Sequence, residues 1–197
     1  MKKIAIYFLS ISVLVLSACG GQESQDAEGN STSYVPVDKM NIKNLEKEIE
    51  KREKALNMDD KSMDKYKARD LMEAYAAYGE RFPNYENAAD RMFKAGELAM
   101  GLGHKVQAIK YFEKVYNEYV DYEKRPYALF MKGFVLENQA MQYDEAKKIY
   151  EQFITEFPTH EMVDDAEYSI KNMGKSPEEL IREFEIQDSI KRAKEAA

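Results

Sequence analysis

The sequence predicts an all-α fold, built as a superhelical stack of antiparallel helix pairs. Helix-favouring residues abound along the 197-residue chain, whereas glycine, proline and β-branched alternation are scarce after residue 40. One amphipathic helical pattern also recurs along the chain. We expect about three to four helix pairs and a C-terminal helix that caps the stack. A chain of this length is suited to one domain with tails and can bury a sizeable core.

The recurring pattern is clearest in residues 143–158. Small Ala146 is followed at helical spacing by Tyr150 and Phe153, and Pro158 prevents the helix from continuing. Two earlier segments keep the same offsets: one has Ala108, Phe112 and Val115, and the other has Leu71, Tyr75, Tyr78 and Phe82-Pro83. A helical pattern that recurs at a fixed period indicates a solenoid, in which each helix pair buries its apolar face against its neighbours.

At these residues the chain resembles the tetratricopeptide repeat family, over about residues 66 to 172. One copy places Ala95, Gly96, Ala108, Phe112 and Val115 at family positions, with Gly103 in the turn between its helices. The spacing is longer than the usual family period of about 34 residues, and Val120 replaces the proline in the middle copy. The resemblance implies a right-handed superhelix whose first helices line a concave groove for peptides.

The longer spacing resembles that of repeats in bacterial envelope lipoproteins, such as the barrel-assembly lipoprotein and the TolA-binding protein. The start of the chain provides an independent test. Two lysines precede an apolar run at residues 4–16, which is too short for a comfortable membrane span and is typical of a secretory signal. The motif Leu16-Ser17-Ala18-Cys19 resembles the lipobox, in which the cysteine is lipidated. The alternative is an ordinary signal peptide with a chance cysteine.

These features predict how the chain is divided. We expect a signal peptide at residues 1–18, lipidated Cys19 and a flexible acidic tether at 19–37, a helical repeat domain at 38–173, and a capping helix with a charged tail at 174–197. The lipid would anchor the protein to the outer membrane without crossing it. The resemblance favours the periplasmic side over the cell surface. The acidic run at 22–28 resembles export signals for the outer face, but we favour the alternative that it is a solvated linker.

The first helix of the repeat domain, expected within residues 38–57, has two interpretations. Its apolar residues at helical spacing are Ile42, Leu45, Ile49 and Leu56, and Arg52 breaks the stripe. The helix forms either a short coiled coil that oligomerises the protein or the first pair of the stack, together with a helix from Ser62 to Phe82. Because the segment has too few heptads for a coiled coil, we favour the pair. A monomer or a member of a hetero-complex is therefore expected.

Further helices are expected near residues 86–101, 105–119, 126–140, 143–157 and 160–172. The boundary after them is marked by Gly174, which ends one helix, and by Ser176-Pro177 and Glu179, which begin the next with a capping box. We expect the last helix to cover the open end of the stack with Leu180, Ile181 and Phe184.

No catalytic signature is found in the sequence. It lacks an HExxH pair, a P-loop, a G-x-S-x-G elbow and a glycine-rich dinucleotide turn. Its two histidines fall in predicted turns, where we expect His104 to be exposed, and the acidic pair Asp164-Asp165 lies near a helix start that favours negative charge. Cys19 is the only cysteine, which excludes an intramolecular disulfide. We therefore predict no enzyme activity, cofactor or metal site.

The acidic net charge of −7 and the absence of a Lys/Arg stripe argue against a nucleic-acid partner. Candidate partner-binding residues are instead taken from the first helices of successive pairs, which line the groove in the family that the chain resembles. They are Phe93, Lys94, Glu97, Phe130, Phe134, Asn138 and Tyr168. The competing interpretation, which we favour for the aromatic members, is packing between helices. A one-residue uncertainty in the alignment between Gly133 and Ala146 is enough to exchange the two roles.

The leading hypothesis is a non-catalytic scaffold that binds a segment of an envelope or outer-membrane protein, in outer-membrane assembly or envelope coordination. The fold resemblance supplies the interaction role. A second hypothesis is a surface lipoprotein whose exposed tyrosines stack on glycans. The third, an enzyme built on acidic side chains, is the least favoured because no convergent catalytic group is found.

Overall fold

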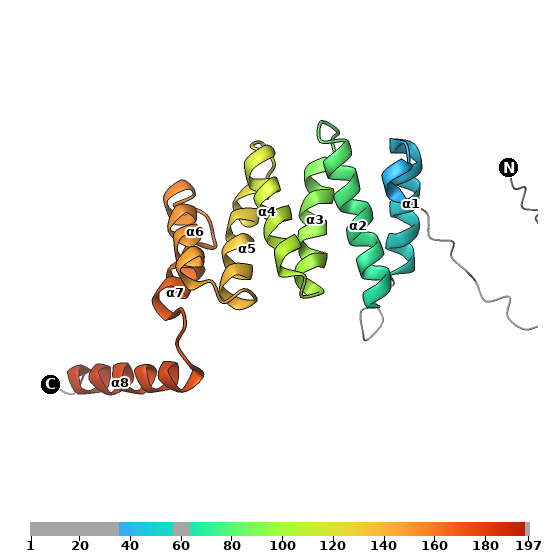
Figure 1. Cartoon of the computed structure of the whole chain (residues 1–197). Helices are drawn as coiled ribbons and strands as arrows, with labels where there is room; N and C mark the ends of the chain where they lie inside the picture. The colour runs from blue at the N-terminus through green and yellow to red at the C-terminus, as the bar shows by residue number, and fades with distance from the viewer. Residues whose placement is uncertain (1–35, 57–63, 196–197) are drawn as a thin grey trace, which may run out of the picture. The chain divides into compact units, whose positions relative to one another are not determined.

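The computed structural model describes residues 36–56 and 64–195 of the chain, and in this part every regular element is helical (Figure 1). The elements are η1 (Val37–Lys39), α1 (Ile42–Ala55), α2 (Lys65–Arg81), α3 (Ala88–Gly101), α4 (Lys105–Glu118), α5 (Arg125–Asn138), α6 (Tyr143–Glu156), α7 (Val163–Asn172) and α8 (Pro177–Glu195). The predicted all-α fold is confirmed. The signal peptide, Cys19, the tether up to residue 35 and Ser62 lie outside the described residues. Val37, predicted as the end of the flexible tether, is instead buried in η1 and belongs to the core.

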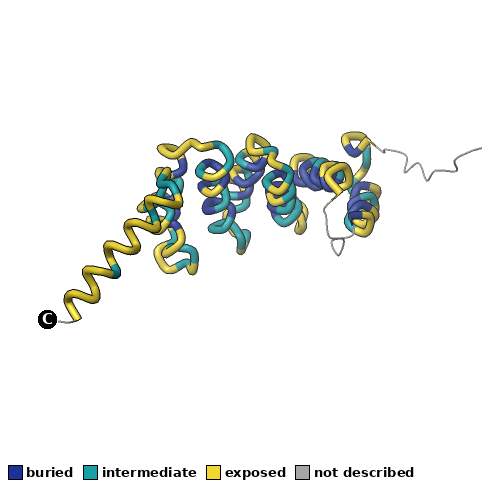
Figure 2. The backbone as a smooth tube through the Cα atoms, turned by 90° about the horizontal axis from the view of Figure 1, so that it is seen from below, coloured by how far each residue is buried: buried dark blue, intermediate teal, exposed yellow. Residues whose placement is uncertain are grey.

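Helices α1 to α7 pack as a stack in which each helix lies beside its neighbour in sequence. Substantial contacts join α1 with α2, α2 with α3, and so on to α7. The helix pairs are therefore α1–α2, α3–α4 and α5–α6, with α7 as the first helix of a further pair. Figure 2 shows buried residues where these helices face one another and exposed residues on their outer sides. This arrangement is the predicted solenoid.

The second helices of the three pairs end with the same backbone geometry. Their last residues are followed by Phe82 (φ −129°, ψ 51°), Tyr119 (φ −114°, ψ 68°) and Phe157 (φ −128°, ψ 56°). In each case the residue three positions on donates its backbone N–H to the carbonyl of this aromatic residue, at 3.0–3.1 Å. Because Tyr119 adopts this geometry without a following proline, Val120 does not alter the turn.

Two glycines let the helices of a pair approach closely. A Cβ atom at Gly96 would lie 2.6 Å from Cε1 of Phe112, and one at Gly133 would lie 2.9 Å from Cε1 of Tyr150. Both distances are shorter than van der Waals contact, so the two rings occupy the space that a side chain would need. The aromatic residues of the sequence repeat thus pack on the glycines of the preceding helix.

The core consists of two clusters that meet within α5. The first extends from Val37 and Leu45 to Ala128 and Val135, and the second groups the remaining buried residues of α5 with those of α6 and α7. The second cluster consists of Leu129, Phe130, Leu136, Ala146, Tyr150, Phe153 and Ala166. Because each cluster is built from consecutive helices, stability is expected to depend on local interfaces.

Arg52 does not break the apolar stripe of α1, contrary to the sequence prediction. Its side chain is buried in line with Leu45 and Ile49. The guanidinium donates from Nε to Glu48 Oε1 at 2.9 Å and from Nη1 to the Asp70 carbonyl oxygen at 2.7 Å. The charge is tolerated because it is paired, and the aliphatic stem extends the packing surface. The predicted α1–α2 pair is formed.

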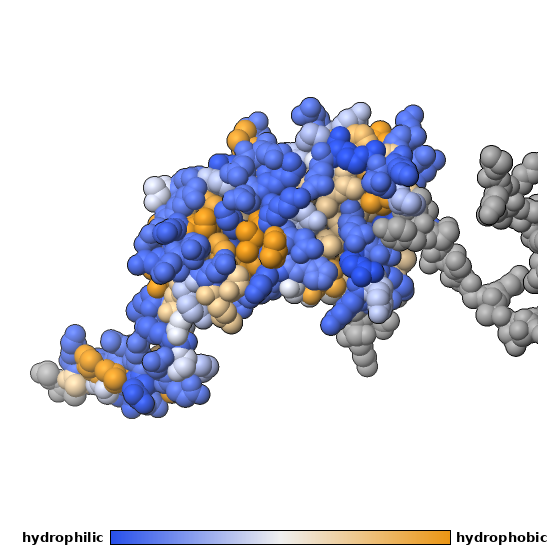
Figure 3. Space-filling model, viewed as in Figure 1, coloured by the Kyte–Doolittle hydropathy of each residue, from blue (hydrophilic) through white to orange (hydrophobic). Residues whose placement is uncertain are grey.

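The prediction that the last helix caps the stack is wrong in this structure. Helix α8 buries none of its residues, and Ile181 and Phe184 are 60% and 73% exposed. Apolar side chains on α8 remain visible at the surface in Figure 3. The helix begins as predicted, since Ser176 N donates to Glu179 Oε2 at 2.7 Å and Glu179 N donates to Ser176 Oγ at 3.2 Å. The capping box therefore specifies where α8 starts, but not what it packs against.

Candidate functional site

Two pockets lie between first helices of neighbouring pairs. The α1–α3 pocket, of about 440 Å³, is lined by Glu53, Leu56, Leu71, Tyr75, Lys94, Glu97, Leu98 and Gly101. The α5–α7 pocket, of about 410 Å³, is lined by Glu137, Asn138, Met141, Tyr143, Tyr168, Ser169, Asn172 and residues 174–176, 179 and 180. Both volumes fall in the range of small ligand sites, roughly 300–1,000 Å³.

The α1–α3 pocket has an apolar floor. Leu56, Leu71 and Tyr75 are all buried and are contributed by α2 and the residue after α1. The Tyr75 hydroxyl donates to Glu53 Oε1 at 2.6 Å, and Arg91 donates to the same oxygen. Burial alone would raise the pKa of Glu53, but the hydrogen bond from Tyr75 and the charge of Arg91 outweigh it and lower the pKa. Glu53 is thus a paired carboxylate.

Glu97, on the α3 side of this pocket, differs from Glu53. Among residues 36–56 and 64–195, no hydrogen bond or ion pair is found for its carboxylate. The nearby Lys94 is bound elsewhere, since its Nζ lies 2.8 Å from Asp90 Oδ2. Although Glu97 is exposed as a residue, partial burial of its carboxyl group raises the pKa, against the opposing charges of Lys124 and Lys94.

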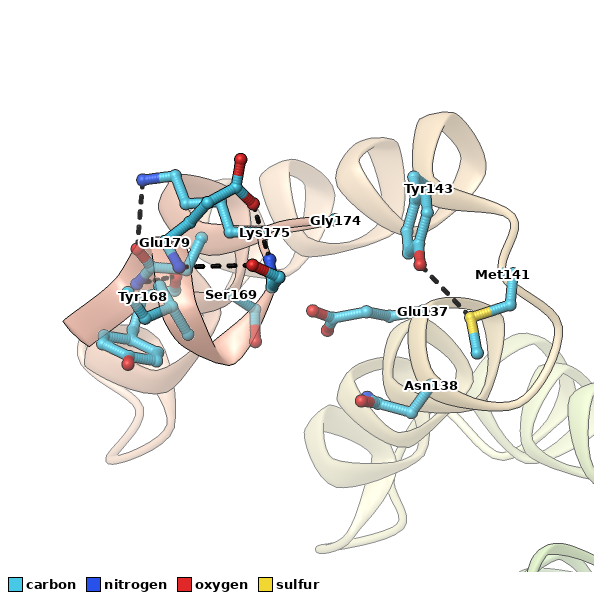
Figure 4. Close-up of a pocket in the computed structure, with 12 residues that line it drawn as sticks. Glu137, Asn138, Met141, Tyr143, Tyr168, Ser169, Gly174, Lys175 and Glu179 are labelled. Atoms are coloured by element: carbon cyan, nitrogen blue, oxygen red, sulfur yellow. Dashed lines mark hydrogen bonds between the residues drawn. The ribbon is translucent and has the colours of Figure 1, made fainter. Parts of the chain in front are cut away.

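The α5–α7 pocket is more polar (Figure 4). Glu137 accepts a hydrogen bond from the Tyr150 hydroxyl at 2.9 Å, and Asn138 donates to the Phe134 carbonyl oxygen at 3.1 Å. On the opposite wall, Lys175 Nζ lies 2.7 Å from Glu183 Oε2. These polar side chains of the pocket are therefore already paired with neighbouring groups outside its lining.

The prediction that Phe93 and Phe130 bind a partner is wrong, because both side chains are buried. Each is only 5% exposed. The Phe93 ring packs on Phe112 with centroids 5.6 Å apart, and the Phe130 ring packs on Tyr150 and Phe153 at 5.4 and 5.6 Å. Neither ring lines either pocket, and both pack on rings of the following helix, so the competing interpretation of packing between helices holds for both.

The remaining candidates do not form one site. Lys94 and Glu97 line the α1–α3 pocket, whereas Asn138 and Tyr168 line the α5–α7 pocket. Phe134, 37% exposed, lines neither. The structure thus divides these candidates between two pockets and an isolated surface position on α5.

Helices α1 and α2 contribute pocket residues that were not predicted from the sequence. Glu53 and Leu56 lie in a segment that was interpreted only for packing, and Tyr75 was assigned to the repeat pattern alone. One signal was present: the next copy has Phe112 where the first has Tyr75. A tyrosine at a packing position indicates a polar partner within reach of its hydroxyl.

The two histidines occupy turns, as predicted, but neither is simply exposed. The His160 ring packs edge-on against Tyr127 and Phe153, with centroids 4.7 and 5.3 Å away. His104 is partly buried and its Nδ1 has no hydrogen-bond partner, so the expected exposed side chain is wrong. Across residues 36–56 and 64–195, no cluster of three or more His, Cys, Asp or Glu side chains is placed to hold a metal ion.

The stacked helix pairs define an α-solenoid, a class of helical repeat protein. Residues 92–121 and 127–160 match the tetratricopeptide repeat family model, and these segments correspond largely to α3–α4 and α5–α6. These two segments are therefore similar to tetratricopeptide repeats, which typically serve as protein–protein interaction scaffolds. No curated protein matches the chain. Within the described helices, none is both long and apolar enough to span a membrane.

Proposed function

We propose that this protein is a non-catalytic scaffold, tethered to the bacterial envelope, whose repeat domain binds a segment of a partner protein. The observation that carries the proposal is the match of two consecutive helix pairs to the tetratricopeptide repeat, together with pockets between first helices. Lys94, Glu97, Phe134, Asn138 and Tyr168 are the candidate contacts. They offer charged, amide and aromatic groups for a segment laid along the stack.

The envelope part of the proposal rests on the sequence. The lipobox-like motif ending at Cys19 supports a lipid anchor, and the acidic tether that follows supports a domain held away from the membrane. The resemblance to envelope lipoproteins favours the periplasmic face of the outer membrane. The partner is then an envelope protein, in outer-membrane assembly or envelope coordination.

Site-specific crosslinking in living cells tests the scaffold role. A photo-crosslinking phenylalanine derivative replaces Phe134, and the matched control carries it at Val106, which is 72% exposed on α4. We expect a discrete envelope protein to be crosslinked at position 134 but not at 106. Equal, diffuse labelling at both positions, or labelling of no envelope protein, would count against the proposal.

The anchor is tested separately with Cys19→Ser. Metabolic labelling with a palmitate analogue is expected to mark the wild-type chain and not the variant, and the variant should leave the membrane fraction. Labelling that persists in Cys19→Ser would contradict the assignment of the acylated residue.

A second candidate function is glycan binding at the cell surface, which the exposure of Tyr66 (75%), Tyr85 (54%) and Tyr168 (62%) favours. Protease added to intact cells separates the two candidates. A domain on the periplasmic side survives the treatment, whereas a surface domain is digested. Release of the tyrosine-bearing domain from intact cells would shift the assignment to the glycan hypothesis.

A further inference from the structure

The floor and the rim of the α1–α3 pocket differ in chemistry, because the floor is apolar and the rim is charged. The floor is formed by the buried residues Leu56, Leu71 and Tyr75. Its one hydroxyl is occupied, because Tyr75 donates to Glu53 at 2.6 Å, and Glu53 also accepts from Arg91. Among the described residues, a ligand group that enters the floor meets mainly apolar atoms and a Tyr75 hydroxyl that already donates, which favours an apolar side chain over a polar one.

The rim of the pocket has the opposite character. Lys94 is engaged by Asp90 at 2.8 Å and lies 6.0 Å from the centroid of the Tyr75 ring. Glu97 has no hydrogen bond or ion pair among the described residues. Glu97 lines the pocket, so its carboxylate can pair with a cation that enters there, next to the nearby charges of Lys94 and Lys124.

We propose that the α1–α3 pocket selects the partner segment by taking one bulky apolar side chain on its floor, while Glu97 binds a Lys or Arg close to it in the segment. The inference rests on the proposed function, since it assumes that the stack binds a protein segment. It adds the chemistry of that segment. A single apolar anchor in a pocket, flanked by a charged contact, is how a short peptide obtains most of its affinity and its register.

The inference is tested by selecting a displayed library of random dodecapeptides on the purified full-length protein. Synthetic peptides from the enriched sequences are then measured by fluorescence anisotropy. We expect enrichment of Leu, Phe or Met with Lys or Arg within three residues. Enriched peptides that show no preference for a basic residue would overturn the role of Glu97.

Variants of the rim test the charge directly. Glu97→Gln is expected to weaken the selected peptides about tenfold, whereas the control Glu145→Gln, an exposed acid on α6, leaves binding unchanged. In a charge exchange, Glu97→Lys should bind better to a peptide whose basic residue is replaced by Glu than to the original peptide. Equal binding of both peptides to Glu97→Lys would contradict a direct ion pair.

A variant at Gly101 tests the floor of the pocket. Gly101 lines the pocket at the end of α3 and does not have a positive φ, so a side chain fits its backbone conformation. Gly101→Leu is expected to fill the pocket and abolish peptide binding, whereas Gln107→Leu, at an exposed position on α4, has no effect. Thermal melts of both variants separate a blocked pocket from an unfolded protein.

The outcomes distinguish this inference from the proposed function. If the selected peptides bind the wild-type protein, Glu97→Gln and Gly101→Leu equally well, they occupy another surface. That result refutes the pocket assignment but does not contradict the scaffold function. If the library yields no enriched peptide and position 134 captures no envelope protein in cells, both are refuted.

Discussion

At the scale of single residues, the contact between the helices of a pair depends on glycine. The ring of Phe112 occupies the space beside Gly96 that a Cβ would need, and Tyr150 does so beside Gly133. Gly101, in contrast, lies exposed at the end of α3. The same residue type therefore serves close packing at two positions and is exposed at the third.

This difference predicts opposite effects of one substitution. Gly96→Ala forces the Phe112 ring to move and is expected to lower the free energy of unfolding by about 1–3 kcal/mol. Gly101→Ala lies at an exposed helical position and gains helix propensity, so it should raise that free energy by up to about 1 kcal/mol. Urea denaturation of the two variants checks both signs. A stabilised Gly96→Ala would show that the interface adapts more easily than its geometry indicates.

The charged form of Glu97 is expected to favour peptide binding but to lower the stability of the free protein. Its folded-state pKa is raised above the usual value of 4.5, so folding favours the neutral form. Protonated Glu97 stabilises the folded state fully at a pH below the pKa of this group in the unfolded chain. This stabilisation is lost as the pH rises through the higher pKa of Glu97 in the folded protein. A charged Glu97 therefore weakens the free protein at neutral pH.

Glu97→Gln is expected to have a higher melting temperature than the wild type at pH 7, because the variant has no charge to desolvate. The advantage should disappear in melts below about pH 4, where even an ordinary glutamate carboxyl group is largely protonated. The control Glu145→Gln should show no pH-dependent advantage of this kind. A constant difference at both pH values would assign the effect to packing and not to charge.

At the scale of elements, α8 shows how a well-specified helix can lack a packing face. Its Leu180, Ile181 and Phe184 lie on one side at helical spacing, while Ile186 and Ile190 lie on another. With the apolar residues divided in this way, no single stripe is available for α7. The sequence repeat also stops before α8, in which no small residue is followed by an aromatic residue at the spacing that packs in α4 and α6.

Removal of residues 177–197 is therefore expected to leave the repeat stack intact. We predict a change in melting temperature of less than about 4 °C, which corresponds to about 1 kcal/mol or less for a domain of this size. Far-UV circular dichroism should lose helical signal only in proportion to α8. A large drop in melting temperature would restore the capping role that the sequence alone predicted.

At the scale of the whole repeat domain, the division of the core within α5 predicts two regions of different stability. Ala146, Tyr150 and Phe153 belong to the cluster shared by α5, α6 and α7, whereas α1 to α4 belong to the other cluster. Interfaces between neighbouring helices carry the stability of such a stack, so damage in one cluster is expected to remain partly local.

Ala146→Arg places a charged side chain at a fully buried position. We expect it to unfold α5 to α7 while α2 to α4 remain folded, which hydrogen exchange measures as lost amide protection in residues 125–172 and retained protection in 65–118. Glu145→Arg, at the exposed neighbouring position, should change protection little. Uniform loss throughout the domain would show that the two clusters unfold as one unit.

The sequence by itself determined the positions and ends of the helices. These features depend on local signals: the spacing of Ala146, Tyr150 and Phe153, the stop at Pro158, and the capping box of Ser176 and Glu179 are each contained within a few residues. For the same reason, the helix pairing of the repeats could be predicted without the structure, since each helix packs on its neighbour in the chain.

Only the tertiary structure decided which faces these helices bury. Phe93 and Phe130 lie in the core because their rings pack on aromatic rings of the following helices, and a rotation of one residue would have exposed them. Arg52 is buried because Glu48 and the Asp70 carbonyl pair its charge. The α1–α3 pocket joins Leu56, Tyr75 and Glu97 from separate elements, and their meeting depends on packing geometry that no local pattern encodes.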